Sequence, residues 1–376
     1  MSSSAVGNSG RPAGMGYGLG LLAVGMVGAL IGWAAGIPAG IMIGALLISG
    51  LIRLAGGERL AHDQLEPWRK RYGWLGRLLL GTVIGAAFGP DLLAPLKAAL
   101  LPMVCLIVAI IGVGLFLGWV LNRLTGLNWA TAIISAVPGG LPAMTAMAED
   151  LDADATVVAA IHFSRLTTIL VIVPLLLQVF VRSQTETTVA VALGEPAALD
   201  ATLATLGLGF LAGLLALKAH VATGDLVAPI LVVGGINLLG GSLGPLPEGF
   251  RQVAMLFIGI SVGFQMSRES LGRLRQVILP AAAVIVTLVS AGLLLGWGLS
   301  RVTPLDLTSA LLSGVPGGAN TIPLIAHDLG GDMRLVAALH LLRQLVMIIL
   351  VPLVLSFLFR GRHRGRFLAP KLPTGG

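Results

Sequence analysis

The sequence predicts an all-α polytopic membrane protein built from two related halves. Hydrophobic residues make up 56% of the 376 positions and charged residues only 11%, whereas a soluble domain carries about a quarter charged residues. Apolar runs long enough to cross a bilayer, about 17 to 25 residues each, recur from Gly18 to Phe359 with short polar breaks between them. The same motifs also occur twice at one constant spacing. Together these observations exclude a soluble fold and predict an internal duplication.

The N-terminal residues 1–16 form a polar tail, and the apolar run after them is interpreted as a retained first span. A cleaved signal peptide is the less favoured alternative, because the run is long and a second span follows directly. In the first half we predict hydrophobic segments at 17–35, 38–55, 74–93, 99–121, 128–149 and 156–181, of which 128–149 is broken by proline and glycine. The resulting organisation is repeat 1 at 17–181, a polar linker at 182–199, repeat 2 at 200–359 and a basic cytoplasmic tail at 360–376.

The duplication is clearest around Val137-Pro138-Gly139-Gly140, which recurs as Val315-Pro316-Gly317-Gly318, 178 residues later (from 138 to 316). The same spacing relates Gly81 and Gly85 to Gly259 and Gly263, Trp119 to Trp297, Arg123 to Arg301, Asp150 to Asp328, Asp154 to Asp332, His162 to His340, and Arg165 to Arg343. A gapless register through such unlike residue types indicates two copies of one unit.

Two topologies are compatible with this organisation. If the broken segment enters the membrane and returns on the same side, each half has about five spanning helices and the second half is inverted. If it crosses, there are twelve crossings and the halves are parallel. The positive-inside rule separates the two only through the cluster Arg268, Arg273 and Arg275, which ten crossings place inside. We favour ten, because inverted repeats with broken segments are a common transporter plan.

Both Pro-Gly-Gly sequences are predicted to interrupt a helix, since proline removes a backbone donor and glycine lowers helix propensity. Non-helical backbone at membrane depth is tolerated only against protein or a water-filled cavity. Pro142 and Pro323 are expected to extend the break, and helices restarting near Met144 and Pro323 would offer free amides to an anion. The alternative is a packing kink. Two equivalent breaks favour a substrate site formed by Pro138, Gly139, Gly140, Pro316, Gly317, Gly318 and Asn320.

Each half also carries a His-x-x-Arg pair on its last span, His162 with Arg165 and His340 with Arg343. Residues three apart share a helix face, and an ionised side chain near mid-depth usually marks a pathway or a charge partner. We add all four residues to the substrate site. The alternative is a structural arginine bonded to backbone carbonyls of the broken segment. The histidines are interpreted as neutral hydrogen-bonding groups, with proton carriage as the other possibility.

An acidic run of Glu149, Asp150, Asp152 and Asp154 follows the first broken segment, and Asp328 and Asp332 match it in the second half. The aspartates that recur at the constant spacing are Asp150, Asp154, Asp328 and Asp332. We predict that they cap the following helix, and binding of a coupling H⁺ or Na⁺ is the functional alternative. Gly81/Gly85 and Gly259/Gly263 have small-xxx-small spacing, which indicates close helix packing and no chemistry. The single cysteine, Cys105, excludes a disulfide within the chain.

The doubled pattern of Pro-Gly-Gly, an acidic cluster, His-x-x-Arg and a proline resembles the AbrB duplication family of bacterial integral membrane proteins. That family has been labelled both as an ammonia monooxygenase and as a regulator of gene expression. More distantly, the pattern is similar to the superfamily of cation/proton antiporters and organic-anion symporters, in which paired glycine-rich broken segments form the substrate site. The resemblance implies a multi-pass protein of the bacterial inner membrane. The small soluble AbrB DNA-binding domain is a different protein.

We therefore predict a secondary transporter of a small solute, with an anion favoured, held between the two broken segments by Arg165, Arg343 and glycine backbone. The alternative is a membrane sensor or regulator that binds a ligand without moving it. Monooxygenase activity is disfavoured because the six histidines lack close ligand spacing, so no enzyme activity, metal or cofactor is predicted. The expected partners are the solute, the lipid bilayer and a coupling ion. A nucleic-acid partner is not expected, because the basic residues lie in loops and in the tail, as the positive-inside rule predicts. Both a monomer and a homo-oligomer are compatible with the sequence.

Overall fold

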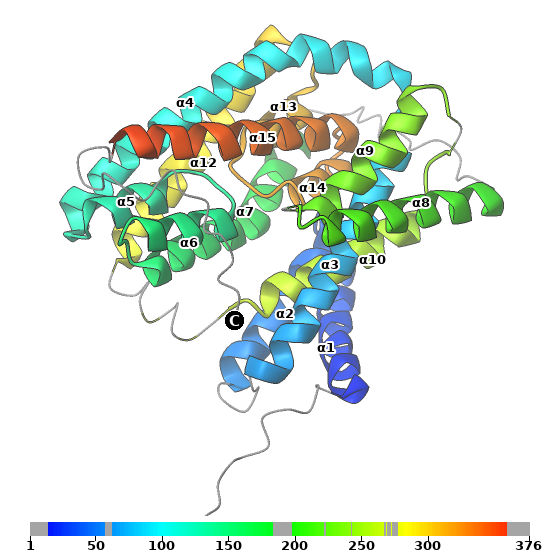
Figure 1. Cartoon of the computed structure of the whole chain (residues 1–376), viewed down its shortest axis with the longest axis horizontal. Coiled ribbons are helices and arrows are strands. Elements are labelled where there is room, and N and C mark those ends of the chain that lie inside the picture. The colour runs from blue at the N-terminus through cyan, green and yellow to red at the C-terminus, as the bar shows by residue number, and fades with distance from the viewer. Residues whose placement is uncertain are drawn as a thin grey trace, which may run out of the picture. The chain divides into compact units, whose positions relative to one another are not determined.

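The computed structural model describes residues 14–56, 62–182, 198–221, 223–241, 243–266, 268, 272 and 277–358. Within these residues all regular structure is helical, which confirms the predicted all-α class (Figure 1). Most of the N-terminal tail, most of the 182–199 linker, the 360–376 tail, Arg273 and Arg275 lie outside the described residues. The helices are α1 (Met15–Ala34), α2 (Gly40–Gly56), α3 (His62–Ala86), the 3-10 turn η2 (Pro90–Leu92), α4 (Leu93–Thr125), α5 (Trp129–Ala136), α6 (Leu141–Asp150), α7 (Ala155–Arg182), α8 (Leu199–Lys218), α9 (Gly224–Leu238), α10 (Glu248–Gly263), α12 (Ile278–Val302), α13 (Leu307–Gly314), α14 (Ile322–Asp328) and α15 (Met333–Leu358).

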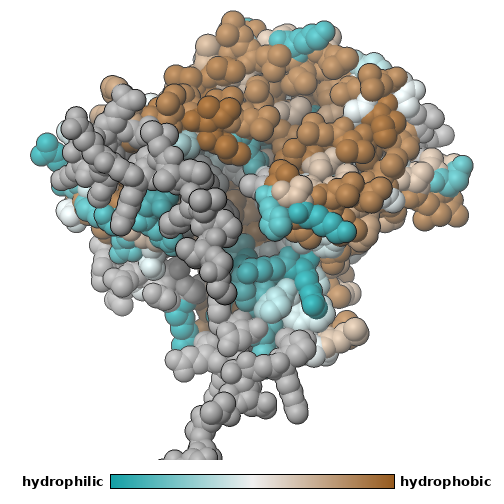
Figure 2. Space-filling view, in the orientation of Figure 1, coloured by the Kyte–Doolittle hydropathy of each residue, from teal (hydrophilic) through white to brown (hydrophobic). Residues whose placement is uncertain are grey.

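The helices have the length and the surface of membrane spans. In the described part of the chain, six of them are long and apolar enough to cross a bilayer: α1, α4 with its preceding turn, α7, α8, α12 and α15. Large apolar side chains such as Leu101, Phe116, Leu279 and Ile349 are exposed, and hydrophobic residues cover much of the visible surface in Figure 2. Such extended apolar surface suits lipid rather than water. The protein is therefore a multi-pass membrane protein, while the count of ten crossings stays a prediction.

The chain divides into two compact units, and each takes segments from both halves of the sequence. The first unit comprises residues 1–92, 170–269 and 323–334, and therefore contains α1–α3, the last part of α7, α8–α10 and most of α14. The second comprises residues 93–169, 270–322 and 335–376, and contains α4–α6, the first part of α7, α12, α13 and most of α15. Corresponding helices of the two predicted repeats thus lie together in one unit.

In the first unit, the repeated glycines allow helices to approach closely. A Cβ atom at Gly81 of α3 would lie 2.4 Å from the Leu226 carbonyl oxygen of α9. A Cβ atom at Gly259 of α10 would lie 2.5 Å from the Met42 carbonyl oxygen of α2. Both distances are too short for a side chain, so the predicted packing role of the small-xxx-small pairs is confirmed.

In the second unit, a further pair of glycine repeats seats the broken segments. A Cβ atom at Gly114 of α4 would lie 2.9 Å from Pro138 Cδ, and one at Gly292 of α12 would lie 2.9 Å from Pro316 Cδ. Gly118 and Gly296, one turn further along, approach α5 and α13 in the same way. These glycines, which our sequence reasoning passed over, hold each break against the long helix that precedes it.

Candidate functional site

Both Pro-Gly-Gly sequences interrupt a helix, as predicted. α5 begins after Asn128, whose side-chain oxygen accepts a hydrogen bond from the Thr131 amide at 2.7 Å, and it ends at Ala136. The next residue, Val137, is extended with φ −65° and ψ 129°. In the second half, α13 ends at Gly314 and Val315 is extended with φ −65° and ψ 132°. Proline at the following position stops both helices in the same way.

The prediction that Pro142 and Pro323 extend the breaks is wrong. α6 begins at Leu141, three residues before Met144, and α14 begins at Ile322, so both prolines lie in the first turn of a helix. A proline there is favourable, because the first amide groups of a helix have no partner within it. The first break is therefore limited to residues 137–140, whereas the second runs through residues 315–321.

At the first break, His162 and Arg165 of α7 contact the backbone of the broken segment. His162 Nε2 lies 2.9 Å from the Ile134 carbonyl oxygen, and its Nδ1 lies 2.9 Å from Arg165 Nη2. A carbonyl only accepts and a guanidinium only donates, so His162 must be neutral with its proton on Nε2. Arg165 Nη2 also lies 3.5 Å from the Gly139 carbonyl oxygen. Its Nη1 is buried and has no hydrogen-bond partner among the described residues.

At the second break, His340 and Arg343 of α15 repeat this arrangement with more contacts. His340 Nε2 lies 3.1 Å from the Leu312 carbonyl oxygen, and Nδ1 lies 2.7 Å from Arg343 Nη2, so the same neutral tautomer is required. Arg343 Nη1 donates to the Val315 carbonyl at 2.6 Å, and Nη2 also donates to the Gly317 carbonyl. The reading of both histidines as neutral hydrogen-bonding groups is confirmed. Carbonyl bonding of the arginine, the structural alternative, is most complete here.

The two His-x-x-Arg motifs come together in the second unit. A Cβ atom at Gly317 of the second break would lie 3.3 Å from Ile169 Cγ2, one turn beyond Arg165 on α7. Both arginines are buried, with exposed fractions of 6% and 7%. Among the described residues, no carboxylate forms an ion pair with either of them. The region where the two motifs meet therefore carries an excess of positive charge.

The remaining glycines and Asn320 lie at the same breaks with different environments. Gly140 is exposed and immediately precedes α6. Gly318 is half-buried, and its carbonyl oxygen accepts from the Thr321 amide at 3.2 Å. A Cβ atom at Gly318 would lie 2.6 Å from Asn320 Oδ1, which places the Asn320 side chain at the second break. Their part in binding stays a prediction.

The four aspartates lie in three different environments. Asp154 Oδ1 accepts from the Thr156 and Val157 amides at 3.0 and 3.1 Å, and Asp332 Oδ1 accepts from the Arg334 amide at 2.8 Å. These two cap α7 and α15, as predicted. The capping prediction is wrong for Asp150, which is exposed at the end of α6, and for Asp328, whose carboxylate binds residues distant in sequence. A coupling-ion role for the four stays a prediction.

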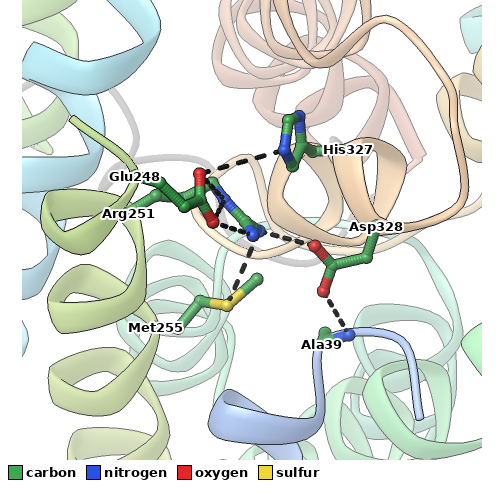
Figure 3. A network of polar contacts seen from close by, with 6 residues as sticks. All are labelled: Ala39, Glu248, Arg251, Met255, His327 and Asp328. Atoms are coloured by element: carbon green, nitrogen blue, oxygen red, sulfur yellow. Dashed lines mark hydrogen bonds and ion pairs between the residues drawn. The ribbon is translucent and has the colours of Figure 1, made fainter. Parts of the chain in front are cut away.

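Asp328 belongs to a network in the first unit that sequence reasoning missed (Figure 3). Arg251 of α10 donates to Asp328 Oδ1 at 2.7 Å and to Glu248 Oε1 at 2.8 Å. Asp328 Oδ2 accepts from the Ala39 amide before α2 at 2.6 Å, and His327 Nε2 lies 3.9 Å from Glu248 Oε2. The i, i+3 spacing of Glu248 and Arg251 was the only feature of the local sequence that could have indicated this network. The other partners come from distant segments. Among the described residues, no group of three His, Cys, Asp or Glu side chains is placed to hold a metal ion.

Comparison with known proteins agrees with the resemblance noted from the motifs. The family described as "Transition state regulatory protein AbrB" matches residues 60–359. A protein of Escherichia coli (strain K12) named "Putative regulator AbrB" is 29% identical over 247 residues, which cover 64% of this chain and 69% of that protein. The "Uncharacterized protein YhjN" of Bacillus subtilis (strain 168) is 25% identical over 349 residues, which cover 88% of this chain and 90% of that protein. With most of its length matched by one family and both halves carrying the motifs, the chain belongs to the AbrB family.

Proposed function

We propose that this protein is a secondary transporter that moves a small carboxylate anion across the cytoplasmic membrane of a bacterium. The proposal rests on the environment of Arg165 and Arg343. Both are buried, both lie against a helix break, and among the described residues neither is paired with a carboxylate. A buried charge is costly unless it is compensated, and in membrane helices such residues are usually functional.

The contacts of the arginines favour an anion over a cation or a neutral solute. Backbone carbonyls and neutral imidazole nitrogens supply only partial negative charge to the two guanidinium groups. A bound carboxylate would supply the missing charge and accept charge-assisted hydrogen bonds. A cation would instead meet two positive groups. Helix breaks at membrane depth are also typical of transporter substrate sites.

The alternative is a ligand sensor that influences gene expression. It is favoured by the family description and by the name of the Escherichia coli relative, both of which refer to regulation. The sequence carries no DNA-binding motif, so such an effect would run through the level of a bound or transported metabolite. On either reading, the protein binds a small solute and catalyses no reaction.

Flux measurements separate the two functions. Purified protein in liposomes would be given ¹⁴C-labelled pyruvate, succinate or glutamate, with ¹⁴C-choline as the cationic control, under an imposed membrane potential, pH gradient or Na⁺ gradient. We expect saturable uptake of at least one carboxylate, driven by one of these gradients, and no uptake of choline. Saturable binding without flux would support the sensor. Choline uptake in preference to the carboxylates would contradict an anionic substrate.

A further inference from the structure

The two helix breaks differ in one contact of the arginine. Arg343 Nη1 donates to the carbonyl oxygen of Val315 at 2.6 Å. Val137 is the counterpart of Val315 in the first half, yet Arg165 Nη1 does not bond to it and has no partner among the described residues. Arg165 is 6% exposed, so water at the protein surface does not replace this contact. Buried donors without partners are rare in native proteins, and each one calls for an explanation.

A serine lies two residues before each of these valines, and the two serines differ in the same way as the two arginines. Ser313 of α13 is fully buried, and its Oγ donates to the Ser309 carbonyl at 2.7 Å. Ser135 of α5, its counterpart, is 1% exposed, and its Oγ has no hydrogen-bond partner within the described residues. Ser135 lies two residues before Val137, at the edge of the first break. Within the part of the chain that the structure describes, two buried donors therefore have no partner at the first break, while their counterparts at the second are both bonded.

We infer that the two breaks are not equivalent and that the first one binds the anion. Arg165 Nη1 is the donor to a carboxylate oxygen of the solute, with Ser135 Oγ as a second donor from the same break. Arg343 is a positioning residue, because its bonds to the Val315 and Gly317 carbonyl oxygens hold the backbone of the second break in place. This assignment rests on the proposed function and narrows it to one arginine.

The geometry also limits how the carboxylate binds. Arg165 Nη2 is already engaged by His162 and Gly139, so a fork through both terminal nitrogens is not free. The carboxylate therefore meets Nη1, which has two N–H groups to offer. His162 keeps the guanidinium in this orientation, because its Nδ1 accepts from Arg165 Nη2 while its Nε2 donates to the Ile134 carbonyl oxygen.

Paired variants of the two breaks test this assignment. Binding of ¹⁴C-labelled pyruvate, succinate and glutamate would be measured by equilibrium dialysis in detergent, with the ligand-free melting temperature of every variant as the control for folding. Arg165→Lys should weaken carboxylate binding by about tenfold or more, because all donors of lysine lie on one nitrogen and cannot reproduce the two separate positions at which Arg165 Nη2 meets His162 and Nη1 meets the solute. Arg343→Lys should mainly lower the melting temperature, with a loss of affinity several times smaller.

The serines give a second comparison with smaller structural changes. Ser135→Ala removes an unpaired hydroxyl, so the ligand-free melting temperature should stay the same or rise while affinity falls by about fivefold. Ser313→Ala removes a satisfied hydrogen bond, so the melting temperature should fall while affinity stays unchanged.

The outcomes separate the inference from the proposed function. If Arg343→Lys weakens carboxylate binding as much as Arg165→Lys, or Ser313→Ala as much as Ser135→Ala, the site is symmetric and the inference is overturned, although the wild-type protein still binds and transports. If the wild-type protein neither binds nor moves any of the three carboxylates, the proposed function itself fails.

Discussion

Three buried arginines in this protein have almost the same exposure and very different surroundings. Arg251 in the first unit is 7% exposed and is paired with Glu248 and Asp328. Arg165 and Arg343 in the second unit are 6% and 7% exposed, and within the described residues their hydrogen-bond partners are carbonyl oxygens and neutral histidines. Burial alone therefore does not identify a functional arginine. The nature of the compensating charge does, because a carboxylate completes the pair within the protein whereas carbonyl dipoles leave part of the charge for a ligand.

The largest loss of stability is expected on replacing Arg251, because two carboxylates of the protein compensate its charge. Arg251→Gln leaves Asp328 and Glu248 without their cation, and removing one partner of a buried pair costs about 3 kcal/mol or more. The free energy of unfolding in detergent micelles measures this. The double variant Arg251→Gln/Asp328→Asn should lose clearly less than the sum of the two single variants. Additive losses would mean that the two side chains do not act as a pair.

The two arginines of the second unit should differ from each other in the absence of solute. Arg343→Lys loses bonds to Val315 and Gly317, so we expect a loss of about 2 kcal/mol in the free energy of unfolding. Arg165→Lys loses only the contact with His162 and the long one with Gly139, and should cost about 1 kcal/mol or less. Equal losses would show that Arg165 is bound within the protein as firmly as Arg343.

The ion-pair network of the first unit should also respond to acid. Burial, together with the charge of Arg251, holds the pKa of His327 below its ordinary value, against the opposing effect of Glu248 and Asp328. The unfolded chain therefore takes up this proton first, and stability should fall as pH drops below about 6.5. His327→Gln should make the melting temperature less dependent on pH between about 7 and 5.5. An unchanged pH dependence would assign the acid sensitivity to other groups.

The smallest structural effect is expected for a test of how the two halves are oriented. Arg123 lies over the Trp119 ring at 5.7 Å and Arg301 over the Trp297 ring at 5.1 Å, contacts worth about 0.5–1 kcal/mol when exposed. In a Cys105→Ala background, Arg123→Cys should react with a membrane-impermeant thiol reagent from the cytoplasm and Arg301→Cys from outside. Labelling of both from one side would mean parallel halves and twelve crossings.

Much of the fold was predictable because its causes are local. Proline and glycine stop α5 and α13 where the sequence places them, and apolar runs of sufficient length become the long helices. The three-residue spacing of His162 and Arg165 predicts a shared helix face, and their contact follows from it. The residues at which helices begin were harder to predict, since a proline such as Pro142 suits both a break and a first helical turn.

Contacts between distant segments could not be predicted in this way. Asp328 binds the Ala39 amide across 289 positions of sequence, and no local pattern marks that partner. Corresponding helices of the two halves also pack together into shared units rather than within each half, which a division of the sequence into two repeats does not reveal. The difference between Arg165 and Arg343 depends on one carbonyl contact in otherwise matching motifs. Only the folded structure therefore distinguishes the two arginines.

An anion that binds Arg165 through Nη1 can be located by crystallography. Crystals grown with 3-bromopropionate, measured at the bromine absorption edge, would locate such a carboxylate directly. We predict an anomalous peak at the first break, with the carboxylate within hydrogen-bond distance of Arg165 Nη1 and Arg343 still bonded to Val315. A carboxylate on Arg343 instead, or an Arg165 Nη1 bonded to a group of the protein, would show that the first break does not bind the anion in this way.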